Sequence, residues 1–209
     1  MNRTTRFALP VVGGITALIL TACGSSSSGS GTGGTPGTQH SPSAAAQPST
    51  TGQHNAADVT FATGMIPHHT QAIQMAQMAI KQADNANLRQ LAAMIKAAQQ
   101  PEIVTMSSWL TAWRQPVPAT GSGHDMGGMD MGGSMMTGAE MTALGKAGGI
   151  VFDRMWLQMM TKHHQGAVTM AKTELTSGSY PAAKNLAQSI IDSQTAEIAQ
   201  MKTLLTTLG

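Results

Sequence analysis

The chain has 209 residues, of which 11% are charged and 3% are aromatic, and its formal net charge is +2. This charge is small and is not gathered in a long basic run, so the sequence does not indicate a nucleic-acid partner. The single cysteine, Cys23, excludes an internal disulfide framework and a cysteine-based zinc or iron–sulfur site. Methionine occurs 17 times. Any metal chemistry therefore has to come from His, Met, Asp and Glu side chains.

The first 22 residues have the pattern of an export signal. Two arginines precede a mostly apolar stretch over 7–20, which is too short to span a membrane. The stretch runs into Leu-Thr-Ala-Cys at 20–23, which resembles the lipobox of bacterial lipoproteins. That resemblance implies a signal peptide over 1–22 and lipidation of Cys23, with the protein anchored at the outer face of the cell membrane or in the cell envelope. The alternative is an ordinary secretory signal with an incidental cysteine.

Residues 23–55 are predicted to form a lipidated, disordered linker. From residue 24 onward the segment consists largely of Ser, Gly, Thr, Pro, Ala and Gln and carries no formal charge. Such a composition cannot bury a core. His40 and His54 lie in this segment and are interpreted as solvated linker residues.

The rest of the chain, 56–209, contains an internal repeat. Shifting the sequence by 95 residues aligns 58–110 with 153–205 without a gap. Most aligned positions differ, so the identical ones indicate constraint. The identical pairs include Asp58/Asp153, Met65/Met160, His68/His163, His69/His164, Ala72/Ala167, Met75/Met170, Ala76/Ala171, Leu91/Leu186, Ala92/Ala187, Ile95/Ile190, Gln99/Gln194, Glu102/Glu197, Ile103/Ile198, Met106/Met201 and Leu110/Leu205.

Each copy is predicted to form two helices. Apolar residues recur at steps of three and four in both copies, and turn-forming residues at 84–87 and 177–181 divide each copy in two. Four helices of about 27 residues in two antiparallel hairpins predict an all-α, four-helix bundle. Pro67 and Pro101 fall inside the predicted helices and are expected to kink them, or to start the first helix late.

The connector over 111–149 is rich in glycine and methionine. His124, Met126, Met129 and Met131 lie in its Gly-rich middle. Further on, Thr137-Gly-Ala-Glu140 matches a capping box and predicts a short helix that ends near residue 148.

The hairpin geometry brings one histidine and one glutamate of each copy to the same height. His68 and Glu102 are each about 17 residues from the first predicted turn, and His163 and Glu197 are similarly placed about the second. Each glutamate lies on the apolar stripe of its helix, where an unpaired carboxylate would be costly. Each glutamate therefore needs a histidine or a metal ion as its partner.

These residues predict a metal cluster at one end of the bundle. Two glutamates and four histidines meet there, next to a layer formed by Met65, Met106, Met160 and Met201. Imidazole and thioether together favour copper, while His and carboxylate also accept zinc or iron. His69 and His164 are interpreted as supporting or substitute ligands. The connector leaves from the same end, so its residues 124–131 are predicted to capture Cu(I). The alternatives without a metal are that the histidines are packed and hydrogen-bonded, that the methionines fill the core and that the connector is a flexible Gly-rich linker.

The doubled pattern resembles a known bacterial family, the "domain of unknown function 305". The resemblance rests on Met-Ile-Pro-His-His at 65–69 and on His-His-Gln-Gly-Ala at 163–167, each followed by a Gln-x-x-Glu-Ile segment at 99–103 and 194–198. It covers about 55–208 and implies a ferritin-like helical bundle. Members are often exported, and some are implicated in copper binding and copper resistance. Pro101 departs from the pattern that this family leads us to expect.

Three functions from different classes follow. The leading hypothesis is an envelope-anchored protein that binds and sequesters copper. This role needs no catalysis, and the sequence does not decide whether the protein is also an enzyme. A second is a ferritin-like dimetal oxidase, but such sites use four Glu and two Glu-x-x-His motifs. The predicted cluster offers two Glu and four His, and the sequence contains no Glu-x-x-His. The third is a structural or interaction lipoprotein in which the His and Glu side chains only satisfy each other.

Overall fold

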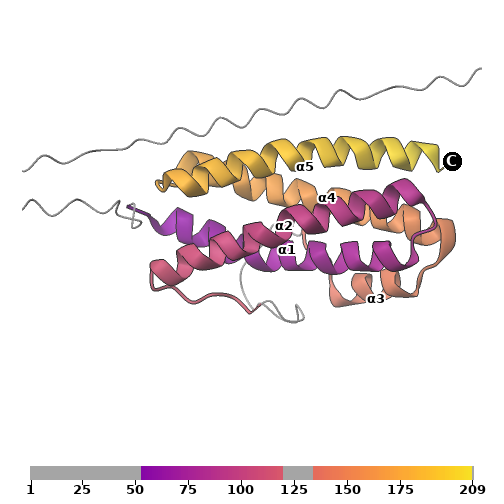
Figure 1. The fold of residues 1–209 in the computed structure, drawn as a ribbon, viewed down its shortest axis with the longest axis horizontal. Helices are drawn as coiled ribbons and strands as arrows, with labels where there is room; N and C mark the ends of the chain where they lie inside the picture. Colours follow the sequence, from indigo (N-terminus) through magenta and orange to yellow (C-terminus); the bar gives the residue numbers. More distant parts are fainter. Residues whose placement is uncertain (1–52, 120–133, 209) are drawn as a thin grey trace, which may run out of the picture. The chain divides into compact units, whose positions relative to one another are not determined.

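A computed structural model describes residues 53–119 and 134–208. This part of the chain forms five helices: α1 (Ala56–Gln82), α2 (Ala86–Ala112), α3 (Gly138–Lys146), α4 (Gly149–Ser177) and α5 (Pro181–Thr207). α1 packs along α2, α4 packs along α5, and α1 and α4 join the two pairs (Figure 1). The predicted all-α fold with a four-helix bundle is confirmed. None of the helices in these two ranges is long and apolar enough to cross a membrane.

Local sequence signals explain where the helices begin. The side chain of Asn55 accepts hydrogen bonds from the first turn of α1, and Asn85 does the same for α2. α5 starts with Pro181 in its first turn, where a missing N–H costs nothing. The predicted capping box is present, since Thr137 and Glu140 cap each other at the start of α3.

The two prolines do not interrupt their helices. Pro67 lies inside α1, which begins at residue 56, and Pro101 lies inside α2. The expectation of a late start for the first helix was therefore wrong. Capping at Asn55 starts α1 well before Pro67. The helix continues past the proline because it packs against the other helices of the bundle.

The two hairpins are antiparallel to each other, and a repeated aspartate fixes this orientation. The carboxylate of Asp153, at the start of α4, accepts hydrogen bonds from the N–H groups of Asp84 and Asn85 in the α1–α2 turn. The carboxylate of Asp58, at the start of α1, accepts from Ser179 and Tyr180 in the α4–α5 turn. Each aspartate thus caps the turn of the other hairpin. This reciprocal contact explains why Asp58 and Asp153 are identical in the two copies.

The core has two apolar halves with a polar layer between them. One half contains Leu88, Ile95 and Trp156, and the other contains Phe61, Leu110 and Ile190. On every long helix the residues between the two halves are polar: His68 and His69 on α1, Gln99 and Glu102 on α2, His163 and His164 on α4, and Gln194 and Glu197 on α5. The repeated polar residues therefore lie near the middle of the bundle.

Candidate metal centre

His68 and His163 meet at the centre of this polar layer. Their ring centroids are 3.7 Å apart, and both side chains are buried. Nδ1 of His68 and both ring nitrogens of His163 lack a hydrogen-bond partner within the described part of the chain. Nε2 of His68 is 3.4 Å from Oγ of Ser134. Buried polar atoms are rarely left unsatisfied, so this pair is suited to a bound cation.

Burial keeps both of these rings neutral. Loss of solvent holds the pKa of His68 and of His163 well below the ordinary value, and the neighbouring histidines lower both further. A neutral imidazole has a free lone pair on one nitrogen, which is the form that binds metal ions. The two rings can therefore offer one ligand each without first losing a proton at neutral pH.

The adjacent histidines bind the glutamates. His69 Nε2 lies 2.7 Å from Glu102 Oε2, and His164 Nε2 lies 2.8 Å from Glu197 Oε2. The sequence had placed Glu102 with His68 and Glu197 with His163. Neighbouring residues on a helix point about 100° apart, and the packing of α1 against α4 turns His68 and His163 toward each other. The other histidine of each pair then faces its own hairpin partner.

The glutamates mark the edges of the layer. Both histidines of these pairs are buried, whereas the side chains of Glu102 and Glu197 are 18% and 17% exposed. Each carboxylate fixes the ring of its histidine, as hydrogen-bonded carboxylates do around metal-bound histidines. Among the residues with defined positions, no three His, Cys, Asp or Glu side chains form a ready-made cage. The donor set is instead one His–His pair flanked by two His–Glu pairs.

The sequence predicted that the four repeated methionines form one layer beside the histidines at one end of the bundle. The structure contradicts this prediction, because the methionines are divided and the histidines lie near the middle. Met65 and Met106 lie in one apolar half, and Met160 and Met201 lie in the other. All four are fully buried. The antiparallel arrangement of the hairpins sends the two methionine pairs to opposite sides of the polar layer. Their positions match core packing as well as soft-metal binding.

Sequence reasoning missed a contact that the end of the connector makes with this layer. The side chain of Gln71 binds the backbone of Met136, with Nε2 donating to the carbonyl oxygen at 2.8 Å and Oε1 accepting from the N–H at 2.7 Å. Ser134 lies against His68 and Gly166, where a Cβ atom would come within 2.0 Å of Ser134 Oγ. Gln71 and Gly166 are aligned in the repeat but differ in type. This difference between the two copies was the sequence signal for the contact. The chain has a single connector, so the two copies need different residues where it packs against them.

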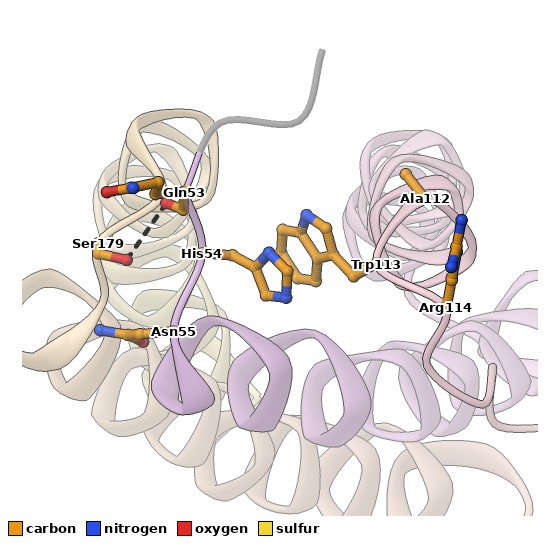
Figure 2. Close-up of a pocket in the computed structure, with 7 residues that line it drawn as sticks. All are labelled: Gln53, His54, Asn55, Ala112, Trp113, Arg114 and Ser179. Carbon is orange, nitrogen blue, oxygen red and sulfur yellow. Dashed lines mark hydrogen bonds between the residues drawn. The ribbon is translucent and has the colours of Figure 1, made fainter. Parts of the chain in front are cut away.

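Several predicted residues lie outside the described ranges. They are Cys23, His40 and the proposed capture residues His124, Met126, Met129 and Met131. His54 is described, and its ring stacks on Trp113 with centroids 4.4 Å apart (Figure 2). The two rings line an open pocket of about 700 Å³ with Gln53, Asn55, Ala112, Arg114 and Ser179. His54 is the only metal-binding type of side chain in that lining, so the pocket is not a second metal centre.

The fold and the site define a class of protein: a duplicated helical bundle with histidines and glutamates across its middle. The chain belongs to the family described as "Domain of unknown function (DUF305)", whose model matches residues 58–205. A DUF305 protein from Streptomyces coelicolor is 36% identical, with a TM-score of 0.65, over 73% of this chain and 92% of that one.

Two further solved structures show the same fold. CopM in its Cu(II)-bound form is 37% identical with a TM-score of 0.63, over 73% of this chain and 97% of that one. CopM has also been solved in Cu(I)-bound, Ag-bound and apo forms. A DUF305 fragment from Deinococcus radiodurans is 28% identical with a TM-score of 0.64, over 75% of this chain and 99% of that one. The comparison with curated proteins finds no match.

Proposed function

We propose that this protein binds copper in the bacterial envelope and sequesters it through the central polar layer. The observation that supports this most strongly is the buried pair His68 and His163, whose rings are in contact and whose nitrogens are largely unpaired. Imidazole is a ligand for both oxidation states of copper, and zinc or iron would compete for the same nitrogens. In this proposal His68 and His163 bind the ion directly.

The flanking residues have supporting roles. Glu102 and Glu197 orient His69 and His164 and are the partly exposed ends of the layer, so they are the first groups that an ion from solvent meets. Met65, Met106, Met160 and Met201 are thioethers on either side of the layer that would favour Cu(I). The proposed capture ligands are the connector residues His124, Met126, Met129 and Met131, which lie outside the described ranges.

The comparisons support the choice of metal. CopM, which shares 37% of its residues with this chain, has been solved with Cu(II) and with Cu(I). The relative from Streptomyces coelicolor carries the description "putative secreted protein", which fits export. We further propose that residues 1–22 are a signal peptide, that Cys23 carries the lipid and that 23–55 is a linker to the bundle.

The donor set does not favour the dimetal oxidase. The carboxylates of Glu102 and Glu197 are each within 2.8 Å of a histidine nitrogen in their own hairpin. A carboxylate-bridged pair of metals needs several carboxylates facing one another across the core. The two glutamates here face different histidines.

The proposal is tested by titrating the full chain, in detergent, with Cu(II) and, under reducing conditions, with Cu(I) against a chromophoric chelator. We compare it with the double variant His68→Gln/His163→Gln and with the matched control His40→Gln/His54→Gln. The central variant should lose at least one copper equivalent, or bind it about 100-fold more weakly, because the loss of even supporting groups costs 10–100-fold. Circular dichroism checks the fold. Equal binding by the wild type and the central variant would refute the proposal.

A further inference from the structure

The methionines are unevenly divided between the two halves of the core. The half next to α3 contains four buried methionines (Met75, Met136, Met160 and Met201) and four partly buried ones at its border (Met78, Met141, Met155 and Met159). The other half contains Met65 and Met106, with Met170 partly buried beside them. Most of the excess lies in the bordering methionines, four against one, which pack on the core and also reach the surface.

The bordering methionines are not part of the repeated pattern. Met78 aligns with Thr173 in the other copy, Met155 with Thr60 and Met159 with Gly64. Met141 lies on α3, which has no counterpart in the repeat. The other copy of the repeat therefore forms the same kind of helical hairpin with threonine or glycine at the equivalent positions. Core filling does not by itself require thioethers at these sites, although methionine often serves as a filler elsewhere.

Two glutamines of α1 hold α3 and the residues before it along the face of α1 that carries Met78. Gln71 binds Met136 just before α3, and Gln82 Nε2 donates to the carbonyl oxygen of Leu144 near its end at 3.4 Å. Met78 is seven residues after Gln71 and four before Gln82, so it lies on the same face of α1, beneath α3.

The same reasoning applies to α4. Gly166 faces Ser134 at the end of the connector. Met159 precedes Gly166 by seven residues, and Met155 precedes Met159 by four, so both lie on that face of α4. Lys162, between them and Gly166, is close enough to lower the pKa of Glu140 at the start of α3, although the capping hydrogen bonds from Thr137 have the larger effect. Met141 follows Glu140 directly. The four methionines thus come from α1, α3 and α4, and α3 contacts α4 and is hydrogen-bonded to α1 through Gln82. Figure 1 shows α3 running along α1.

We infer that Met78, Met141, Met155 and Met159 form a second metal site, a thioether site for a soft monovalent cation of the Cu(I) or Ag(I) type. Thioethers select Cu(I) among biological metals and bind the harder divalent ions poorly. Met155 and Met159 stand one turn apart on one helix, so they can approach one ion together. Their partial exposure gives an ion direct access from solvent. This site is separate from the histidine layer and does not depend on it.

The test uses the full chain and Ag(I), an air-stable probe, with Cu(I) under anaerobic conditions as the second probe. The variant Met78→Leu/Met141→Leu/Met155→Leu/Met159→Leu keeps the apolar volume, and Met→Leu exchanges are usually well tolerated. The matched control is Met94→Leu/Met170→Leu, which changes one exposed and one partly buried methionine elsewhere. The quadruple variant should bind one Ag(I) and one Cu(I) equivalent fewer than the wild type, whereas the control should bind the same number.

A direct measurement keeps the inference testable if the quadruple variant fails to fold. Labelled methionine ε-methyl groups of the wild type, assigned by single Met→Leu changes, should shift on addition of Ag(I) at these four positions. The same shifts should persist in His68→Gln/His163→Gln, which separates this site from the central layer. The inference is overturned if the quadruple variant binds as many equivalents as the wild type, or if these four methyl signals do not respond.

Discussion

His68 and His163 occupy equivalent positions in the two copies, and their rings are in contact at 3.7 Å between centroids. Neither copy alone can form this pair, since α1 supplies one ring and α4 the other. If one ion is held between the two rings, removing either ring removes the site. We therefore predict that His68→Gln and His163→Gln each weaken copper binding as much as the double variant does.

This prediction is checked by measuring the copper affinity of the wild type, both single variants and the double variant, with His54→Gln as the control. Residues that act as a unit are strongly non-additive. If the two single effects instead add up to the double effect, each histidine binds its own ion.

The two His–Glu pairs should contribute equally to stability. Replacing Glu102 by alanine leaves buried His69 without the carboxylate 2.7 Å from its Nε2, and Glu197→Ala does the same to His164 at 2.8 Å. An unsatisfied buried polar group costs about 1–3 kcal/mol. Urea unfolding of each metal-free variant should show a loss in this range. Asp192→Ala, at an exposed position, should change stability by no more than about 0.5 kcal/mol, and a loss of this small size in the glutamate variants would contradict the prediction.

Asp153 should contribute more to the stability of the fold than its position near the start of a helix suggests. Its carboxylate accepts two backbone hydrogen bonds from the other hairpin, at 3.1 Å from the Asp84 nitrogen and 2.8 Å from the Asn85 nitrogen. A hydrogen bond to a charged group contributes about 1.5–3 kcal/mol. Asp153→Ala should therefore lower the free energy of unfolding by about 2–4 kcal/mol, measured by chemical denaturation. A loss within about 0.5 kcal/mol, as expected for a surface aspartate, would show that the turn does not depend on this cap.

Much of this architecture can be read from the sequence because its signals are local. The turns near 85 and 179 and the capping box at Thr137 each depend on neighbouring residues, and the 95-residue repeat applies the same local pattern to both copies. These signals predicted the four long helices and the short one. The orientation of one hairpin against the other could not be obtained in this way. It depends on contacts such as that of Asp58 with Ser179, which are 121 residues apart.

The candidate site illustrates the same limit. That the repeated His and Glu residues share one level followed from helix lengths and was predicted. Which histidine of an adjacent pair meets Glu102 depends on how far α1 is rotated toward α4, and the apolar pattern does not resolve a rotation of about 100°. With antiparallel hairpins the shared level is the middle of the bundle. The contact of Ser134 with His68 depends on the path of a connector that has no periodic pattern.

Glu174 should set an alkaline limit to stability. Its carboxyl group is buried beside Asp58, and burial, followed by the proximity of the Asp58 carboxylate, raises its pKa to about 8. Between the unfolded value of 4.5 and about 8, the folded state keeps a proton that the unfolded state releases. Stability then falls as pH rises, by about 1.4 kcal/mol per pH unit. From about pH 6.5 to 8 the metal-free protein should lose about 2 kcal/mol.

The buried histidines act in the opposite direction. The pKa values of His68 and His163 are lowered in the folded state, so below pH 6.5 the unfolded chain takes up protons that the folded protein does not. Stability should therefore also fall on acidification, which places the maximum near pH 6.5. Chemical denaturation of metal-free wild type and Glu174→Gln across pH 5–9 checks this. The variant should lose the decline above pH 6.5 and keep the acid one; an unchanged alkaline decline would assign it to another group.

Gly166 should be irreplaceable while Ser134 is present. A Cβ atom at Gly166 would lie 2.0 Å from Oγ and 2.1 Å from Cβ of Ser134, and 3.3 Å from Nε2 of His68. Gly166→Ala must therefore push the end of the connector away from the histidine layer, even though alanine is otherwise the better helix former by about 1 kcal/mol. Overpacking of this kind costs about 1–3 kcal/mol. We expect a net loss of stability and a changed environment of His68, seen as a shift of its ring signals in NMR spectra.

The double variant Gly166→Ala/Ser134→Gly separates this clash from any general effect of alanine on α4. Removing the serine side chain deletes both of the closest contacts, so the penalty of the alanine should largely disappear in that background. A double-mutant cycle on the free energy of unfolding measures this coupling. If Gly166→Ala costs as much in the Ser134→Gly background as it does in the wild type, the serine does not lie against α4 in solution, and the connector does not reach the histidine layer at that point.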